Sequence, residues 1–377
     1  MLAASSAGAG CMPVASTPLR CLGPLALSLA CATAAAQAPA TTDLARLDGF
    51  ALGLEAAGRF SGVVLVAHDG QVVFEKAYGL RDETGEAPLR TDDRLNLASA
   101  GKMFTSVAIL QQVAAGRITL DSHVGEVLED YPNRAFADTV TVRQLLTHTA
   151  GAGDVDELFG AEHAAERARL RSAADIIALH GRRAPQFAPG TQQKYGNYGY
   201  VVLGRMVEVL SGQDFESYVR AHVLAPAGMT RTGFVDCDDP APDLAAGYAE
   251  VEGRRVRNCA TLPARGFAAG GQVAPASDLL RFVQALRDGR LLPLPLFRRA
   301  TTPQHEFMGL GFFATGYGPG VPERDFRWGH GGSADGICTD VRTYPHTGET
   351  VIVLSNKDAP ACFAVSNLLH AQWKDAP

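Results

Sequence analysis

The chain of 377 residues carries 34 basic and 40 acidic side chains, with 46% hydrophobic and 20% charged residues. These proportions are typical of a folded globular protein, so they exclude a disordered or low-complexity scaffold for most of the chain. The length suffices for one large domain or two packed subdomains. A formal net charge of -6, without any run of five basic residues, argues against nucleic acid as a partner.

The first 38 residues differ in composition from the rest of the chain. Arg20 is their only charged side chain, an apolar run follows at 21–30, and Ala36-Gln37-Ala38 comes after it. A basic residue, a short apolar core and an A-x-A pattern predict a secretory signal peptide at 1–38 and a periplasmic or secreted protein. The apolar run is too short for a stable membrane span, and no longer one follows.

Two alternatives concern the same segment. A disordered Ala-rich tail is one, and a lipoprotein anchor at Cys31 is the other. We prefer the signal peptide to the anchor, because Ser28 stands where a lipobox usually has Leu. The start codon is left open between Met1 and Met12.

The cysteine count agrees with export. Cys11, Cys21 and Cys31 lie in the predicted signal, and Cys237, Cys259, Cys338 and Cys362 remain. An even number in an exported chain permits two disulfides, with three possible pairings. We favour Cys237–Cys259 and Cys338–Cys362 because each pair is local in sequence, and four free buried thiols are the alternative. The spacings are not those of a zinc site, and we predict no metal.

The mature chain begins with a helix and a hairpin. Apolar residues from Leu44 to Leu54 lie on one helical face that Gly58 ends. Two β-branched runs, 62–68 and 71–75, flank Asp69-Gly70 and predict a β-hairpin. Helical patterns then dominate from about 99 to 225. They include a capping box at 141–144 and an apolar stripe at 202–210 that Gly212 ends.

Strand patterns return near the C-terminus, at 310–314, 336–342 and 350–354, with a turn at 345–348 and a last helix at 364–373. Strands at both ends with helices between them predict an α+β fold, in which one sheet is built from the two chain ends and a mostly helical lobe is inserted. We place the sheet lobe at 42–98 and 266–377 and the helical lobe at 99–265, within one domain at 39–377. A cleft between such lobes is a common place for chemistry.

The sharpest local motif is Ser99-x-x-Lys102. It opens a helix with an apolar face at 103–114 that ends at Gly116. Residues three apart share a helix face, so Ser99 Oγ and Lys102 Nζ can meet. A buried lysine with a lowered pKa can deprotonate a serine nucleophile. By itself the motif is weak, because an N-cap serine followed by a solvated lysine would look the same.

Two further groups carry polar chemistry. Tyr195-Gly196-Asn197 follows a Pro-Gly turn and precedes the helix at 200–210. Tyr195 can relay a proton if cations lower its pKa, and Asn197 can donate to a substrate carbonyl. Both could instead be structural, as a core aromatic residue and a helix cap.

The third group is Trp328-Gly-His330-Gly-Gly332-Ser333, in which glycines permit close backbone approach. A strand N–H group here could form half of an oxyanion hole, with the Ser99 N–H group as the other half. His330 could hold a proton or bind a carboxylate. A glycine-rich bulge with an exposed histidine is the alternative.

Together and in this order, S-x-x-K, Y-x-N and H-x-G resemble the serine β-lactamase and penicillin-binding-protein-like family, on its class C side. Segments such as Leu145-Leu-Thr-His-Thr-Ala-Gly151, Phe187-Ala-Pro-Gly190, Leu224-Ala-Pro-Ala-Gly-Met229 and Ala269-Gly-Gly271 also resemble the family's, and the resemblance covers about 45 to 370. It implies an antiparallel sheet with flanking helices and a mostly helical lobe, with the active site between them.

The resemblance also implies roles for single residues. Ser99 matches the acylated nucleophile, Lys102 its base or base partner, and Tyr195 the proton relay. Asn197 matches the contact to the substrate amide. Gly332 and Ser333 match the strand that supplies the second oxyanion N–H group, and His330 stands where β-lactamases carry lysine. No metal or organic cofactor is implied.

His330-Gly331-Gly332 departs from the Lys-Thr-Gly motif of β-lactamases. Because histidine is largely neutral at pH 7, a permanent cation is lost. This favours esters, short peptides or D-amino-acid amides as small-molecule or peptide substrates.

The sequence therefore predicts an exported serine hydrolase that cleaves an ester or amide through a Ser99 acyl-enzyme. The alternatives are a weak β-lactamase and a slowly acylating penicillin-binding module with little turnover. No G-x-S-x-G elbow, H-E-x-x-H zinc motif or dinucleotide-binding loop supports another enzyme class. The oligomeric state is left open.

Overall fold

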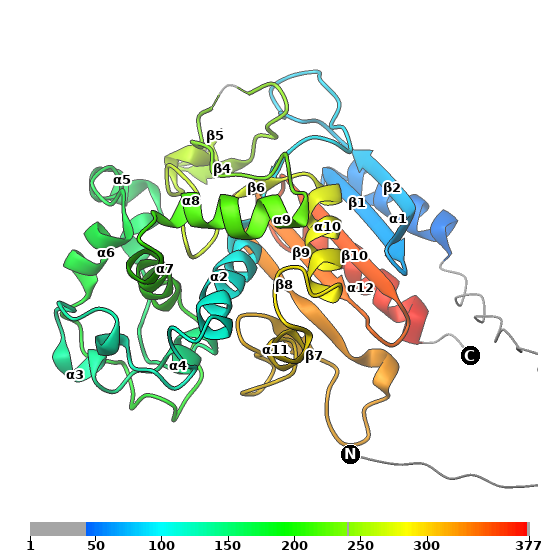
Figure 1. Ribbon diagram of the computed structural model, residues 1–377. Coiled ribbons are helices and arrows are strands. Elements are labelled where there is room, and N and C mark those ends of the chain that lie inside the picture. Colours follow the sequence, from blue (N-terminus) through cyan, green and yellow to red (C-terminus); the bar gives the residue numbers. More distant parts are fainter. Residues whose placement is uncertain (1–42, 240, 375–377) are drawn as a thin grey trace, which may run out of the picture. The chain divides into compact units, whose positions relative to one another are not determined.

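The main sheet of the protein has six strands, drawn from both ends of the chain (Figure 1). A computed structural model describes residues 43–239 and 241–374, so the predicted signal peptide lies outside the described residues. The helices are α1 (Leu44–Ala56), α2 (Lys102–Ala114), α3 (Arg134–Ala137), α4 (Val142–Leu146), α5 (Ala164–Arg167), α6 (Ala173–His180), α7 (Tyr198–Ser211), α8 (Phe215–Val219), α9 (Ala225–Ala227), α10 (Ala276–Arg287), α11 (Leu294–Ala300) and α12 (Ala361–Lys374). The strands are β1 (Gly62–His68), β2 (Gln71–Tyr78), β3 (Leu95–Asn96), β4 (Tyr248–Val251), β5 (Arg254–Arg257), β6 (Val273–Ala274), β7 (Phe313–Thr315), β8 (Arg327–Ala334), β9 (Ile337–Thr343) and β10 (Glu349–Ser355).

Short tight turns of helix complete the elements. A 3₁₀ turn, η1 (Ala98–Gly101), leads directly into α2, and a π-helical turn, η5 (Arg220–Leu224), joins α8 to α9. The other 3₁₀ turns are η2 (Val124–Glu126), η3 (Asp156–Leu158), η4 (Ala161–His163), η6 (Asn258–Ala260) and η7 (Glu323–Asp325).

The strand order is β2-β1-β10-β9-β8-β7, and every neighbouring pair is antiparallel. In the central pair, Gly62 of β1 lies opposite Ser355 of β10 and His68 lies opposite Glu349. The N-terminal hairpin thus joins the C-terminal strands, which confirms the predicted sheet of two chain ends. The α+β fold class is confirmed with it.

Helices cover both faces of this sheet, and β1 is buried throughout. Val64 and Val66 pack with α1 and α12, whereas Val63 and Leu65 face the larger core that contains α2 and α10. Figure 1 shows α1 and α12 together on one side of the sheet. Each buried valine or leucine adds about 1.5–3 kcal/mol, and alternate residues of one strand therefore hold both helical layers in place.

Most predicted elements are present. The hairpin turn has Asp69 and Gly70 at φ 48° and 80°, as a tight turn of this type requires. Thr141 and Gln144 form the predicted capping box of α4, and Gly212 ends α7 in the left-handed conformation. The segment 236–265 falls in the predicted helical lobe, but it contains the hairpin of β4 and β5.

One predicted strand is only partly present. We expected a strand at 310–314, but β7 covers only Phe313–Thr315. The chain turns at Gly311, where φ is +81°, and Leu310 and Phe312 on either side of it are both fully buried. The segment 310–312 thus turns within the core instead of extending β7, so its apolar run reflects burial of a turn.

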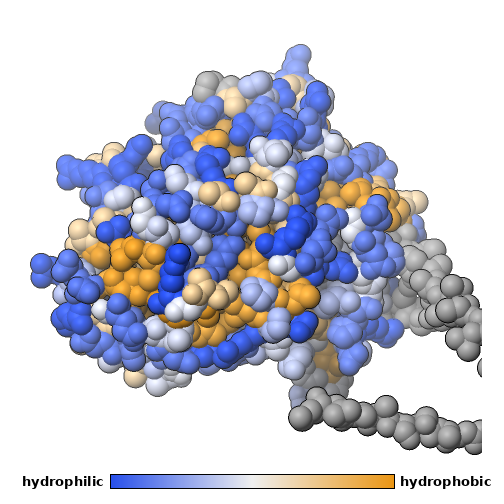
Figure 2. Space-filling model, in the orientation of Figure 1, coloured by the Kyte–Doolittle hydropathy of each residue, from blue (hydrophilic) through white to orange (hydrophobic). Residues whose placement is uncertain are grey.

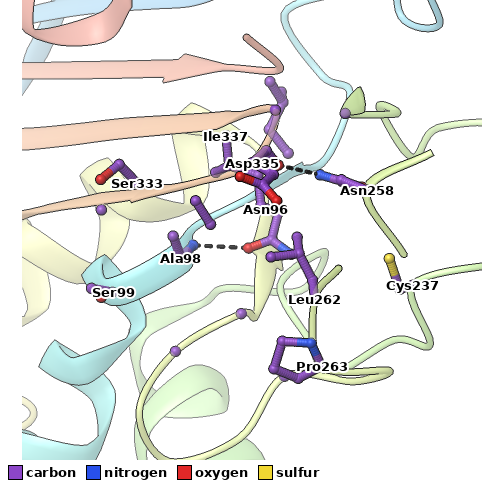
Figure 3. Close-up of a pocket in the computed structure, with 18 of the residues that line it drawn as sticks. Asn96, Ala98, Ser99, Cys237, Asn258, Leu262, Pro263, Ser333, Asp335 and Ile337 are labelled. Atoms are coloured by element: carbon purple, nitrogen blue, oxygen red, sulfur yellow. Dashed lines mark hydrogen bonds between the residues drawn. The ribbon is translucent and has the colours of Figure 1, made fainter. Parts of the chain in front are cut away.

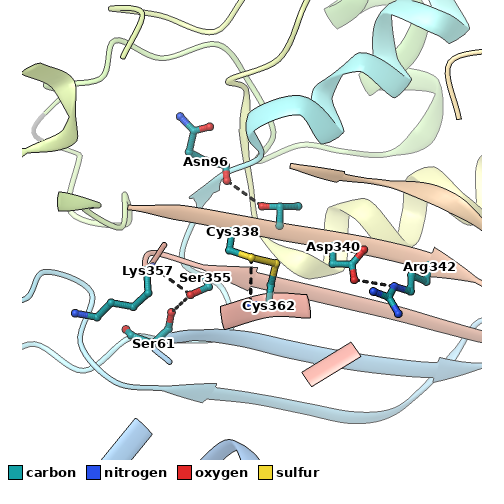
Figure 4. The surroundings of a disulfide bond; sticks show 9 residues. Ser61, Asn96, Cys338, Asp340, Arg342, Ser355, Lys357 and Cys362 are labelled. Atoms are coloured by element: carbon teal, nitrogen blue, oxygen red, sulfur yellow. Dashed lines mark hydrogen bonds and ion pairs between the residues drawn. A yellow bond between two sulfur atoms is a disulfide. The ribbon is translucent and has the colours of Figure 1, made fainter. Parts of the chain in front are cut away.

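Both expected disulfides are present. Cys237–Cys259 closes the segment that carries β4 and β5, and Cys338–Cys362 joins β9 to the start of α12 (Figure 4). Each closes a loop of more than twenty residues. In the chain-entropy description, each bond of this loop length stabilises the folded state by about 3 kcal/mol.

This pairing makes a prediction about thiols. A chain that starts after residue 38 should show no free thiol when it is denatured without reductant, because all four of its cysteines are paired. Thiol titration with Ellman's reagent in guanidinium measures this, and the same sample after reduction is the control. Four reactive thiols before reduction would contradict the pairing, although they would leave the hydrolase untouched.

The face shown in Figure 2 is mostly hydrophilic, with apolar areas over the region of α6 and α7 and near α11. Exposed apolar residues of these helices include Leu179, Val209 and Leu294. Such residues are ordinary at protein surfaces. Across 43–239 and 241–374, no helix has the length and apolar character needed to cross a membrane.

Candidate active site

Ser99 lies in the 3₁₀ turn η1, between strand β3 and helix α2. The residue before it, Ala98, has φ +42°, which alanine rarely adopts. Two hydrogen bonds hold it there: the Ala98 N–H group donates to Asn96 Oδ1 at 2.8 Å, and the Gly271 N–H group donates to the Ala98 carbonyl at 3.0 Å. The surrounding structure therefore imposes the backbone position of Ser99.

Glycine backbones approach this turn from two sides. A Cβ atom on Gly332 of β8 would lie 2.8 Å from the Ser99 backbone nitrogen, and one on Gly270 would lie 3.2 Å from Ser99 Cα. No larger residue fits at Gly332 without moving one of the two backbones. Because Gly332 has no side chain, β8 can bring its backbone N–H groups next to the N–H group of Ser99.

Lys102, one turn further along, is fully buried. Its Nζ atom lies 3.1 Å from Ser99 Oγ, 2.6 Å from Asn197 Oδ1 and 2.7 Å from the Ala269 carbonyl oxygen. Burial lowers the pKa of Lys102 from 10.5 to about 7, against the negative charge of Asp154, which raises it. The alternative of a solvated lysine after a capping serine is thereby excluded.

The partners of Lys102 suit a neutral amine. Asn197 Oδ1 and the Ala269 carbonyl can only accept, whereas the Ser99 hydroxyl can also donate. A neutral amine has two N–H groups and one lone pair, so it can donate to the two oxygens and accept the Ser99 proton. The geometry is that of a base hydrogen-bonded to a nucleophile.

Asp154 orients Asn197. Its Oδ1 atom accepts hydrogen bonds from Asn197 Nδ2 at 2.8 Å and from the Asn197 N–H group at 3.1 Å. This leaves Asn197 Oδ1 directed at Lys102. Asn197 occupies the N-cap position of α7, but its side chain makes no capping hydrogen bond. The alternative that its side chain serves as a helix cap is therefore excluded.

Tyr195 lies over the same lysine. Lys102 Nζ is 5.0 Å from the centre of the Tyr195 ring, and the ring of His148 packs against Tyr195 at 4.2 Å. Although Tyr195 is 40% exposed, burial by surrounding protein raises its pKa, and a hydrogen bond with Ser99 only partly offsets this. The condition considered for a relay, a pKa lowered by cations, is therefore not met: Tyr195 is a neutral phenol at ordinary pH.

His330 is buried in β8, so the alternative of an exposed histidine in a bulge is excluded. Its ring stacks on Phe313 at 4.0 Å and lies 6.3 Å from the Tyr195 ring. Burial and the nearby Lys102 lower the pKa of His330 to about 3, although its contact with the Gly331 carbonyl raises it. That 2.5 Å contact to a carbonyl requires the proton on Nδ1. His330 is therefore neutral, as expected, and borders Tyr195.

A cavity of about 560 Å³ opens beside Ser99 (Figure 3). Tyr195, Asn197, Gly332 and Ser333 also line it, whereas His330 does not. Its apolar wall comes mainly from the segment 235–273, which includes Phe267, and from three further phenylalanines, Phe159, Phe313 and Phe363. Binding sites for small molecules commonly have this size and this mixture of apolar walls and few polar groups.

The structure thus brings together the predicted residues of all three motifs. His330 packs near Tyr195 but does not line the cavity. Sequence reasoning missed Asp154, His148 and the Ala269 carbonyl as parts of the site. His148 and Ala269 belong to segments already noted for their resemblance, and Asp154 follows one of them closely. That position was the available signal, but it did not indicate a contact with the motifs.

Comparison with known proteins agrees with this geometry. The family model described as Beta-lactamase matches residues 47–372. Esterase EstB of Burkholderia gladioli is 32% identical over 71% of this chain and 73% of its own. A D-aminopeptidase of Brucella anthropi is 28% identical over 73% of this chain but only 52% of its own.

A solved structure supports the same assignment. The penicillin-binding protein from Bacillus halodurans superposes with a TM-score of 0.76 at 27% identity, over 85% of this chain and 99% of its own. The expected transpeptidase-like fold is thereby confirmed. The chain belongs to the beta-lactamase family and is a serine hydrolase of that family.

Proposed function

We propose that the protein cleaves an ester or amide through an acyl-enzyme on Ser99. The observation that carries this proposal is the 3.1 Å contact between Ser99 Oγ and the fully buried Nζ of Lys102. A lysine whose pKa is near 7 is partly neutral at physiological pH and can take the serine proton.

Acylation would then run as follows. Lys102 accepts the Ser99 proton as Oγ attacks the carbonyl carbon, and the backbone N–H groups of Ser99 and Ser333 stabilise the oxyanion. Tyr195, a neutral phenol beside Lys102, donates its proton to the leaving group and is reprotonated from Lys102. In deacylation the same groups act in reverse on water, which releases the acid and free Ser99.

The substrate class follows from charge. Because burial and Lys102 lower the pKa of His330 to about 3, its ring is neutral near pH 7, so β8 lacks the cation that its β-lactamase counterpart has. The relatives named as an esterase and a D-aminopeptidase favour ester or amide substrates. A weak β-lactamase activity, or slow acylation with little turnover, are the alternative outcomes.

We also propose export to the periplasm or the medium, with removal of 1–38. Two disulfides are compatible with an oxidising compartment. We further propose the division of the mature domain into a sheet lobe at 42–98 and 266–377 and a helical lobe at 99–265.

The test is steady-state hydrolysis of p-nitrophenyl butyrate by the exported chain. The proposal expects many turnovers per enzyme molecule, lost in Ser99→Ala. A single burst equal to the enzyme concentration would instead support the slowly acylating module. D-aminoacyl anilides and a chromogenic cephalosporin then separate the amidase and β-lactamase alternatives.

Asp154 provides a separate prediction about positioning. Asp154→Ala should lower kcat/KM by about 10- to 100-fold, because Asn197 loses the acceptor that orients its amide toward Lys102. The negative charge of Asp154 raises the pKa of Lys102. Its loss should therefore move the acidic limb of the pH profile to lower pH.

The control is Asp156→Asn, which removes an exposed carboxylate two residues away. Profiles of kcat/KM from pH 5 to 9 are compared for the wild type and both variants. A drop in activity with an unshifted acidic limb would indicate a purely structural role for Asp154, and it would contradict its influence on Lys102.

A further inference from the structure

The polar side chains that line the cavity beside Ser99 are mostly engaged within the protein. A side chain with satisfied hydrogen bonds has little to offer a ligand, whereas an unsatisfied one is available. The engaged groups are Asn96 (to the Ala98 N–H group), Asn197 (to Lys102 and Asp154), Asn258 (to the Asp335 carbonyl), Thr261 (to the Asn258 carbonyl), Ser355 (to the Ser61 carbonyl) and the Nδ2 group of Asn356 (to the Leu80 and Ala246 carbonyls), whose Oδ1 atom is buried.

Three charged side chains line the same cavity: Arg257, Arg265 and Asp335. Arg257 pairs with Asp82 at 3.6 Å, and Arg265 pairs with Glu216 at 2.6 Å and with Asp236 at 3.3 Å. Within the described part of the chain, the Asp335 carboxylate has neither an ion pair nor a hydrogen bond. The cavity wall therefore carries one uncompensated negative charge.

Asp335 lies close to the proposed oxyanion site. It is the first residue of the turn between β8 and β9, two residues after Ser333 (Figure 3). Two residues of extended chain span at most about 7 Å. Ser333 and Asp335 are both exposed, while Gly332 is buried. A group bound at Asp335 would therefore lie only a few bonds from a carbonyl held at the Ser333 N–H group.

The backbone of this turn is held in place on both sides. Asn258 Nδ2 donates to the Asp335 carbonyl at 2.8 Å, and the Gly336 N–H group donates to Asp358 Oδ1 at 2.7 Å. The first bond ties the turn to the segment that Cys237–Cys259 closes. A carboxylate on an anchored backbone loses less entropy on binding a cation than one on a free loop.

We propose that the Asp335 carboxylate is a subsite for an ammonium group of the substrate. The substrate class is then acyl donors that carry a protonated amine within a few bonds of the scissile carbonyl. This inference rests on the proposed Ser99 hydrolase and adds its selectivity. Because Asp335 is exposed, the pair contributes selectivity through one charge-assisted hydrogen bond and not through a desolvated ion pair.

Competition at pH 7 tests this with two probes of similar size, glycine anilide and acetanilide. They differ by one amino group, which is protonated in glycine anilide. Each is used as an inhibitor of p-nitrophenyl butyrate hydrolysis. In the wild type, glycine anilide should bind about tenfold more tightly, as expected for one charge-assisted hydrogen bond. In Asp335→Asn this ratio should fall to within about twofold of one, and in Asp335→Lys acetanilide should bind more tightly.

Asp238→Asn is the charge-matched control, since Asp238 is exposed and does not line the cavity. It should keep the wild-type ratio. Equal inhibition constants in the wild type, or an unchanged ratio in Asp335→Asn, would overturn the proposed subsite. Absence of turnover of p-nitrophenyl butyrate would instead be a failure of the proposed hydrolase. In that case the ratio of the two dissociation constants is measured by calorimetric titration of the two anilides.

Discussion

Ser99→Ala is expected to abolish the turnover of p-nitrophenyl butyrate, with a loss of kcat of at least about 10⁴-fold. The hydroxyl is the group that would carry the acyl chain, and it is the only nucleophile in hydrogen-bond contact with Lys102 among the described residues. Residual binding and the oxyanion N–H groups would remain, because they belong to the backbone. Loss of the covalent intermediate is therefore the specific effect.

Mass spectrometry of the quenched reaction gives the second measurement. The wild type should show the mass of a butyryl group on the peptide that contains Ser99, and the variant should show none. Ser211→Ala, at the C-terminal end of α7, is the matched control and should retain both activity and acylation. Full activity in a verified Ser99→Ala preparation would contradict the assignment of Ser99 as the nucleophile.

Lys102→Met should lower kcat/KM by about 10²- to 10⁴-fold, the usual contribution of a general base. Methionine fills a similar volume but cannot accept the Ser99 proton. Lys102→Arg should not restore activity, because arginine keeps the charge and does not deprotonate at accessible pH. Lys76→Met is the control, since Lys76 lies on the edge strand β2 and pairs with Asp48 of α1.

The pH profile distinguishes a base from a structural cation. Because burial places the pKa of Lys102 at about 7, the neutral, active form grows as the pH rises through this value. Activity should rise tenfold per pH unit below about 7 and level off above it. A flat profile from pH 5 to 8 would contradict a lysine base, as would full activity in Lys102→Arg. A structural cation would instead favour low pH.

The motifs were recognisable because their spacing is local. Ser99 and Lys102 are three residues apart, and one helical turn is enough to bring them together wherever the helix lies. The same holds for the hairpin at Asp69-Gly70 and for the capping box at Thr141, whose partners are at most a few residues away. Disulfide partners separated by 22 and 24 residues could still be paired by proximity in sequence.

Other features needed the folded chain. The strand predicted at 310–314 begins only at Phe313, because an apolar run looks the same whether it alternates in a sheet or turns inside a core. Burial raises the pKa of Tyr195 even though Lys102 lies beside its ring. Burial of a given side chain depends on distant segments, so no local pattern predicts such a balance.

Residue types and their order were therefore sufficient to identify the fold class, the family and the residues of its motifs. Only tertiary structure joined Asp154 to Asn197, 43 residues away, and placed the Ala269 carbonyl on Lys102, 167 residues away. Among residues 43–239 and 241–374 it also left the Asp335 carboxylate without a partner, while it paired the two arginines of the same cavity. The physical reason is that charge, hydrogen-bond satisfaction and desolvation are settled between segments that meet only when the chain is folded.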